Sequence, residues 1–377
     1  DCLKNLIAGE QYLIQNLKTS FSGFNEVYIL PRLILTDNIE KEALNNLAEK
    51  IKNTFNRIDN WEGYEDAANY FINYKDVVIP DDYAHFDLIF FEKENQATKI
   101  FKIIKDIDPF IIGRINLILN EINNQLLNKL NNKNLKLSFK NIYYLFPIKE
   151  KNNKKLKYKE LLNLYDNIFH KQQVNYINII KNIIIVVNIL MFKIDGYNIK
   201  ISENNIVNDF DLIDKIIKAN LLLKFLKNLN CIKEVGNVIK IQESPLSDEI
   251  KEFITMMNYN EQQTAMFILG YLIGKIGNEQ YNSREKKTIL NKLNFKGVDI
   301  YKIKRLTNEI FEKLIQEKIL SKNEVEFGEY KKLIDSNLPN WNMSKEENLF
   351  YILSGYSYAT EKAILNKKKE EIQDEQQ

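Results

Sequence analysis

One stretch organises the C-terminal half of this 377-residue chain, residues 261–305: EQQTAMFILGYLIGKIGNEQYNSREKKTILNKLNFKGVDIYKIKR. Its first part, residues 262–276, is apolar and predicts a helix. Its second part is basic: between Tyr281 and Arg305 there are eight cations and two acids, a local charge of +6 in a chain of net charge +2. Positive charge gathered beside well-formed helices is typical of a surface that holds a polyanion.

Three glycines interrupt the apolar part of this stretch. Gly270, Gly274 and Gly277 are spaced four and three residues apart, so they share one side of the predicted helix. Each glycine costs about 1 kcal/mol relative to alanine inside a helix. Their presence therefore predicts that another backbone packs closely there. The spacing matches neither a dinucleotide-binding nor a phosphate-loop motif.

A second basic segment covers residues 131–160, with nine lysines, two acids and a net charge of +7. Aromatic residues are interleaved with the lysines. The two segments sum to +13, so the rest of the chain carries −11 and the charge is segregated. Lysines outnumber arginines 48 to 5, which suits diffuse phosphate contact better than base reading. The alternative is a solvated helix face or a lysine-rich loop between domains.

The N-terminal part alternates element types. Helices are expected over residues 3–17 and from residue 37 or 38 to 58. Strands are expected over residues 27–35, where Pro31 indicates an edge strand or a bulge, and over residues 86–91. A polar turn at residues 92–96 then leads into an apolar-periodic, helix-like segment. That segment breaks at Asp108, because a residue before proline avoids helical backbone, and a new helix is expected from Phe110 to Leu130.

From Lys159 onward the pattern is mostly helical. Residues 183–192 indicate a buried strand or a core helix, and residues 209–229 a helix. Residues 236–241 indicate a short hairpin or winged element. Ser244 followed by Pro245 predicts a helix start and the last domain boundary.

The final third gives the clearest helical pattern. Residues 303–315 form one amphipathic helix. Ser344 and Glu347 form a capping box that opens a helix through about Leu365. The chain therefore predicts an α+β, predominantly helical fold. Its expected parts are a mixed α/β part over residues 1–158, a helical connecting region over 159–243, a C-terminal helical bundle over 244–366 and a frayed charged tail over 367–377.

Residue types exclude several site classes. Cys2 and Cys231 are far apart and form no zinc or disulfide pattern, which favours a reducing cytoplasm. The two histidines match no metal or nuclease motif, so no cofactor and no metal are expected. The acid pairs 81–82 and 106/108 lack a third ligand and are interpreted as turn and cap residues. The apolar run 183–192 is too short to span a membrane.

The C-terminal part of the chain, which begins with the opening stretch at residue 261, resembles a known family. The resemblance rests on residues 261–280, the basic connection with residues 290–297, Trp341, and residues 350–356, FYILSGY. This pattern is similar to the C-terminal half of the large subunit of type I-B CRISPR Cascade, the TM1802-like proteins. It extends upstream through residues 27–35 and 105–114. Family members are longer at the N terminus, so the chain is expected to be N-terminally incomplete.

The resemblance implies a non-enzymatic role in antiviral defence. It implies binding to target DNA near the protospacer-adjacent motif, to the displaced strand and to the R-loop. It also implies partners: crRNA-containing Cascade backbone subunits, a small subunit, and a helicase-nuclease recruited in trans. The C-terminal bundle is expected to resemble the Cascade small subunit, for which Met256 or Met257 would suit an internal start.

The candidate nucleic-acid-binding residues are drawn from both basic segments. They are Gln280, Arg284, Lys286, Lys287, Lys292, Lys296, Lys302, Lys304 and Arg305 in the first, and Lys151, Lys154, Lys155 and Lys157 in the second. Two other functions stay open. One is a protein–protein scaffold with basic docking faces, and the other is a divergent metal-dependent nuclease using Asp81, Asp82, Asp106 or Asp108.

Overall fold

The computed structural model describes residues 9, 11, 13–33, 49, 84–94, 97–151, 154–199, 209–233 and 241–374. The strands form an antiparallel four-stranded sheet in the order β1-β2-β3-β4 and a separate two-stranded hairpin. Their bounds are β1 (Lys18–Phe21), β2 (Phe24–Leu33), β3 (Ala84–Glu94), β4 (Ala97–Ile107), β5 (Lys149–Lys151) and β6 (Lys154–Leu156).

Helices make up most of the described chain, so the predicted α+β, predominantly helical class is confirmed. The α-helices are α4 (Pro109–Leu130), α5 (Phe139–Tyr143), α6 (Lys159–Phe169), α7 (Tyr176–Phe192), α8 (Asp209–Asn228), α9 (Asp248–Met257), α10 (Glu261–Arg284), α11 (Ile300–Gln316), α12 (Glu324–Asn337) and α13 (Lys345–Asp374). The other short helices are the π-helix η1 (Leu13–Leu17) and the 3-10 helices η4 (Lys133–Leu135), η5 (Ile241–Glu243), η6 (Thr288–Lys292), η7 (Leu320–Lys322) and η8 (Leu338–Asn340).

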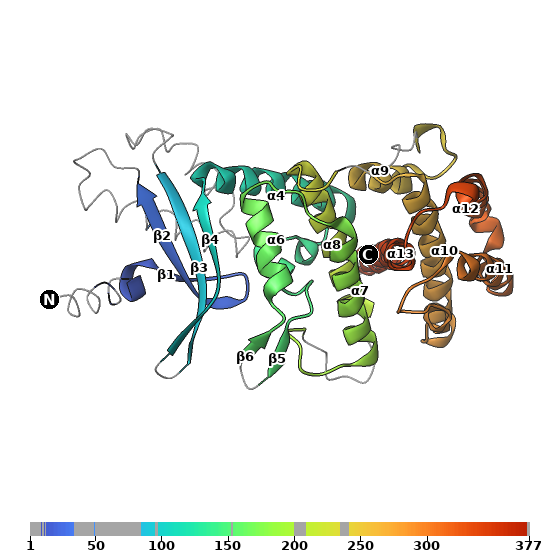
Figure 1. The fold of residues 1–377 in the computed structure, drawn as a ribbon. Helices are drawn as coiled ribbons and strands as arrows, with labels where there is room; N and C mark the ends of the chain where they lie inside the picture. The colour runs from blue at the N-terminus through green and yellow to red at the C-terminus, as the bar shows by residue number, and fades with distance from the viewer. Residues whose placement is uncertain are drawn as a thin grey trace.

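The elements are arranged in three groups along the molecule (Figure 1). The four-stranded sheet lies at one end, α4, α6, α7 and α8 lie in the middle, and α10 to α13 lie at the other end. One cluster of buried apolar side chains nevertheless runs through all three groups, from Phe21 in β1 to Tyr358 in α13. The helical groups therefore share a continuous core.

The sheet is ordered by its turns and its bulges. Ser22 and Gly23 join β1 to β2, both with positive φ, as a two-residue hairpin turn requires. Pro31 in β2 pairs with Phe86 of β3. The part of β2 that pairs with β1 extends only from Phe24 to Tyr28. Among the described residues, Pro31 thus lies beyond the part of β2 that pairs with β1, so its missing N–H removes no ladder bond to β1.

The helix-like segment before Asp108 is strand β4, so that interpretation was wrong. Its ladder with β3 contains two register shifts, and one of them lies between the pairs Leu88↔Ile104 and Phe86↔Ile107. The extra residue lets Ile104 and Ile107 both face the core although they are three apart. Asp106, with φ +54°, lies in this bulge. This bulge therefore sets two buried apolar residues three apart, a spacing that is also typical of a helix.

The break at Asp108 is confirmed. The side chain of Asp108 caps α4 by accepting from the backbone N–H of Phe110 at 2.9 Å, and Pro109 occupies the first turn. Residues 183–192 are the C-terminal part of α7, which settles them as a core helix. The predicted helix at residues 37–58 and the hairpin at residues 236–240 lie outside the described residues, apart from Glu49.

The predicted start at Ser244 is displaced. The Ser244 hydroxyl accepts from Leu246 N–H at 3.3 Å and so shapes the turn after η5, while α9 begins at Asp248 after Ser247. The capping box at α13 is confirmed: Ser344 Oγ accepts from the N–H of Glu347, and the Glu347 carboxylate accepts from the N–H of Ser344.

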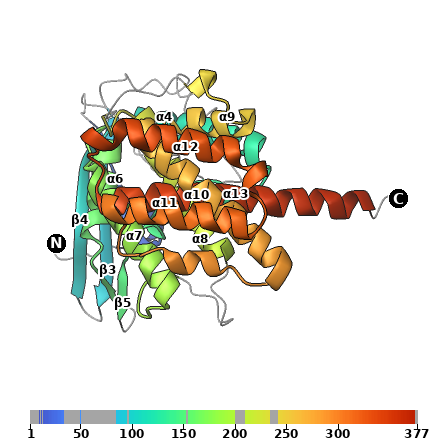
Figure 2. The same ribbon diagram turned by 90° about the vertical axis from the view of Figure 1, so that its right-hand side faces the viewer.

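The last helix is longer than predicted. It continues to Asp374, so residues 367–374 are helical where a frayed tail was expected. Figure 2 shows these last turns of α13 extending beyond the rest of the molecule.

The glycine pattern is explained by contact between α10 and α13. A methyl group added at Gly270 would lie 1.8 Å from the carbonyl oxygen of Ile352, and one added at Gly355 would lie 1.8 Å from that of Phe267. A methyl group at Gly274 would lie 2.6 Å from the Ala359 Cβ and 3.1 Å from the Tyr356 carbonyl oxygen of α13, whereas one at Gly277 would meet only side chains, at 3.3 Å or more. The two helices therefore touch backbone to backbone, which confirms the close packing predicted from the sequence.

We expect Gly355→Ala to lower the free energy of unfolding by at least about 2 kcal/mol, because the new methyl group would force α10 and α13 apart. Urea denaturation of the full chain measures this. Gly328→Ala is the matched control, since it is the same change inside α12 with no atom within 4 Å. It should raise the stability by about 0.5–1 kcal/mol. Similar effects of the two changes would contradict the backbone contact.

Candidate nucleic-acid interface

The first basic segment is held in place by buried residues at the end of α10. Gln280 is fully buried. Its Oε1 accepts from Ile289 N–H at 3.0 Å and from Thr288 Oγ1 at 3.2 Å, and its Nε2 donates to Glu317 at 3.2 Å. Gln280 therefore shapes the connection between α10 and η6, and its amide is not exposed to a ligand.

Several predicted cations pair with acids of the same region. Arg284 donates to both carboxylate oxygens of Glu317, at 3.3 and 3.0 Å. Lys292 and Arg305 both contact Glu309, at 3.3 and 2.8 Å. Counting Glu309 and Glu317 with Glu285 and Asp299 gives eight cations against four acids, so the effective charge is +4, less than the +6 of the linear segment.

The carboxylates of Glu309 and Asp299 have pKa values below the usual range and so stay charged to lower pH. The hydrogen bond from Arg305, followed by Lys292, holds the pKa of Glu309 below its usual value. The backbone N–H of Lys302 similarly lowers the pKa of Asp299, whose side chain also contacts the Lys302 ammonium at 3.3 Å. These carboxylates therefore compete with any anionic ligand for the cations beside them.

Lys287 is used inside the protein. Its ammonium donates to Asn278 Oδ1 at 3.3 Å and to the Tyr356 hydroxyl at 3.5 Å. It also lies 5.5 Å from the centre of the Tyr356 ring and 6.0 Å from that of Tyr281. Lys287 therefore joins the basic connection to α13, and removing it would disturb packing as well as charge.

Three lysines are available to a ligand. Lys286, Lys296 and Lys304 are exposed, and no ion pair is found for them among the described residues. The sequence reasoning missed Tyr301, which is 80% exposed and lies one helical turn before Lys304 and Arg305 on α11. An exposed ring next to cations can stack on a base. Tyr301 could have been identified from the sequence, because it lies outside the apolar face predicted for residues 303–315.

The candidate lysines of the second basic segment lie in and just after the β5–β6 hairpin. Lys151 and Lys154 face each other as the last pair of this ladder, and their side chains lie outside the described set. Lys157 is exposed with φ +61°. Lys155 turns inward: its ammonium donates to the carbonyl of Gly23 and lies 5.2 and 4.9 Å from the ring centres of Phe24 and Tyr143.

The environment of Lys155 differs from that of a phosphate-binding surface lysine. Burial lowers its pKa, while Glu150 and Glu92 oppose that effect. It lies on the wall of a pocket of about 440 Å³ between the β1–β2 turn and the hairpin. The two basic segments are not brought together, because the hairpin lies beside the sheet and α11 lies at the opposite end of the molecule (Figure 1).

Acid clusters do not provide an alternative site within the part of the chain that the structure describes. There, no group of three His, Cys, Asp or Glu side chains is placed to hold a metal ion. Asp108 caps α4 and Asp106 lies in the β4 bulge, while Asp81 and Asp82 lie outside the described residues. His170 contacts Asp166 and the carbonyl of Lys105.

No described helix is both long enough and apolar enough to cross a membrane.

Comparison with known proteins supports the resemblance found in the sequence. The model of the CRISPR-associated protein TM1802 C-terminal domain matches residues 137–370, and that of the TM1802 central domain matches residues 1–107. Helix α4 and the short helix η4 fall between the two matches. No curated protein matches the chain. Because the C-terminal domain match alone covers more than half of the 377 residues, the chain belongs to the CRISPR-associated TM1802 family.

Proposed function

We propose that this chain is the non-catalytic large subunit of a type I-B CRISPR-Cas surveillance complex. In this role it binds target DNA around the protospacer-adjacent motif, the displaced strand and the R-loop. It works with crRNA-containing subunits and a small subunit, and presents a surface to a helicase-nuclease that cuts. Membership of the TM1802 family supports a CRISPR-associated role.

The observation that carries the DNA-binding part is the surface formed by η6 and α11. Its exposed cations Lys286, Lys296 and Lys304 lack carboxylate partners among the described residues, and the exposed Tyr301 lies one helical turn before Lys304 on α11. The support is rigid, because Gln280 and the α10–α13 contact fix the connection. Such a surface holds phosphates without reading sequence.

A protein-docking role is the second candidate, and one surface favours it. Phe311 and Ile315 on α11 and Val325 on α12 are exposed apolar side chains, with exposed fractions of 39%, 51% and 47%. A scaffold using this surface would show no nucleic-acid affinity above background in a filter-binding assay.

A divergent nuclease would cleave DNA in the presence of magnesium. Co-purification of the chain with RNA separates both from the leading proposal.

Replacing Lys286, Lys296 and Lys304 together by Ala should weaken DNA binding and lower the slope of log affinity against log salt by about 3, since each phosphate contact releases about one counterion. Fluorescence anisotropy of the purified chain with a DNA duplex over a salt series measures this. Stability should be unchanged, because none of the three has an ion pair among the described residues.

The matched control replaces Lys322, Lys331 and Lys332, on η7 and α12, by Ala. It removes the same charge from a different place. A binding loss as large as that of the first triple variant would mean that only the net charge matters and would sink the assignment of the η6–α11 surface.

Glu309→Gln should increase DNA affinity, because it frees Lys292 and Arg305 from the carboxylate between them. The stability cost should stay below about 1 kcal/mol, as for other solvent-accessible ion pairs. The control is Glu312→Gln, the same charge change on an exposed residue of α11. Equal gains for the two variants in the anisotropy assay would argue against contact of Lys292 and Arg305 with DNA.

An internal start at Met256 or Met257 would give a product lacking α7 and α8. Both methionines are buried at the end of α9, and α7 and α8 pack against α13. We expect such a product to expose the Tyr351 side of α13 and to need a partner there. N-terminal sequencing of any short co-purifying product tests this, and a start elsewhere would contradict it.

A further inference from the structure

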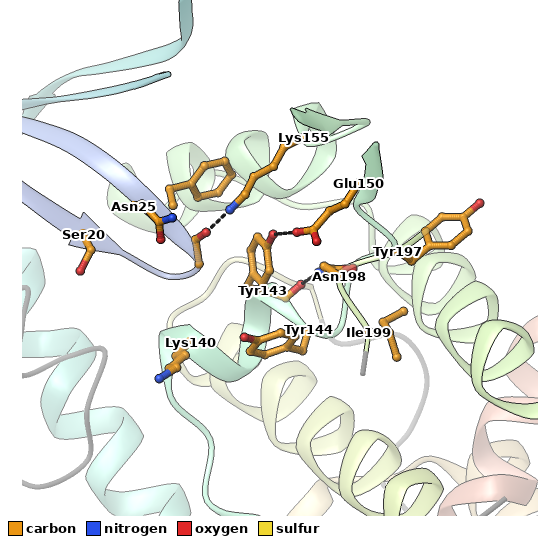
Figure 3. Close-up of a pocket in the computed structure, with 12 residues that line it drawn as sticks. Ser20, Asn25, Lys140, Tyr143, Tyr144, Glu150, Lys155, Tyr197, Asn198 and Ile199 are labelled. Carbon is orange, nitrogen blue, oxygen red and sulfur yellow. Dashed lines mark hydrogen bonds between the residues drawn. The ribbon is translucent and has the colours of Figure 1, made fainter. Parts of the chain in front are cut away.

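We propose that the pocket between the β1–β2 turn and the β5–β6 hairpin holds one unstacked nucleotide of a single-stranded nucleic acid. This inference rests on the proposed function and gives it a second contact, remote from the η6–α11 surface. The pocket is lined by residues from three chain segments (Figure 3). Its volume of about 440 Å³ lies within the range of about 300–1,000 Å³ that is common for small-ligand sites.

The pocket offers aromatic surface for a base. Tyr144 and Tyr197 are half-buried and line it. Tyr143 packs edge-on against Tyr144, with ring centres 5.2 Å apart, and the Lys215 ammonium lies 5.5 Å from the centre of the Tyr144 ring. The Tyr144 ring is therefore held in place before a ligand arrives. Stacking on such a ring contributes about 1–3 kcal/mol per base.

Glu150 supplies an acceptor for the edge of the base. Its Oε1 accepts from the Tyr143 hydroxyl at 3.0 Å, and its Oε2 has no hydrogen-bond partner among the described residues. Burial, followed by the charge of Glu150, raises the pKa of Tyr143, so the hydroxyl remains a donor and keeps the carboxylate in place. A carboxylate accepts from an exocyclic amino group, such as that of cytosine. Thymine has no amino group and should bind less well.

The other side of the pocket suits a phosphate. Lys140, Asn25 and Ser20 lie across Tyr143 from Glu150 and Tyr197 (Figure 3). All three are exposed, and Lys140 has no acid partner within the described part of the chain. A nucleotide can therefore place its phosphate near Lys140 and its base between Tyr144 and Glu150. An acidic peptide fits less well, because it has no base to stack on Tyr144 and no amino group of a base to donate to Glu150.

The neighbouring turn preserves this shape. A methyl group at Gly23 would lie 2.4 Å from the Tyr143 ring, and Gly23 has φ +77°, so only glycine allows this turn to lie against Tyr143. Lys155 then ties the Gly23 carbonyl to the hairpin. The interior lysine is thus a positioning residue, while Lys140 is the cation that a phosphate can reach.

The test measures anisotropy of the full chain with three single-stranded probes of equal length: oligo(dC), oligo(dT) and an abasic deoxyribose-phosphate strand. Wild-type protein should bind oligo(dC) most tightly and the abasic strand least. Tyr144→Ala should weaken oligo(dC) binding at least about fivefold and leave the abasic strand unchanged. Glu150→Gln should narrow the preference for oligo(dC) over oligo(dT). Lys140→Ala should weaken all three. An oligo(rC) arm tells whether RNA or DNA is preferred.

Tyr144→Phe keeps the ring and should bind oligo(dC) like wild type. Unchanged binding of the abasic strand shows that the alanine variant is folded. The proposal is overturned if Tyr144→Ala weakens the abasic strand by the same factor, if it leaves oligo(dC) unaffected, or if an acidic peptide competes better than oligo(dC). Failure of the pocket proposal can be told apart from failure of the proposed function. The Lys286, Lys296 and Lys304 triple variant tests the η6–α11 surface, and it should lower binding of all probes without changing the preference among bases.

Discussion

The backbone contact between α10 and α13 is the constraint on which the helical half depends. Two long helices usually pack through side chains at axial distances of about 8–10 Å, whereas here glycines on both helices remove that layer. This close contact fixes the position of α10 relative to α13. It therefore also fixes the point at which the basic connection leaves α10. Gln280 then closes the connection onto η6. The position of the exposed lysines thus follows from a contact in the core.

A buried polar network joins the middle helices to this pair. The hydroxyls of Tyr176 in α7 and Tyr351 in α13 lie 2.5 Å apart. Asn220 in α8 donates to Ser354 of α13 and accepts from Tyr259, at 2.8 and 2.5 Å. Buried polar groups are costly unless they are paired, so this network specifies one arrangement of α7 and α8 on α13.

The sequence predicted features that are local or carry a strong signature. The capping box at Ser344, the helix start after Asp108 and the glycine contact all follow from short-range rules. Strand β4 could not be identified in this way, because a bulge sets its buried residues Ile104 and Ile107 three apart, as in a helix. The charge of the candidate surface was also overestimated. Glu309 and Glu317 neutralise cations that only the folded chain brings beside them, and no linear count includes those pairs.

The pocket beside the hairpin joins chain segments that belong to different family domains. Gly23 and Phe24 come from the region matched by the central domain, whereas Tyr143, Lys155 and Asn198 come from the region matched by the C-terminal domain. The cavity exists only while the sheet is seated on the helices. A molecule bound there would contact both domains. Because it binds only when the two domains are in contact, it would stabilise that arrangement against their separation.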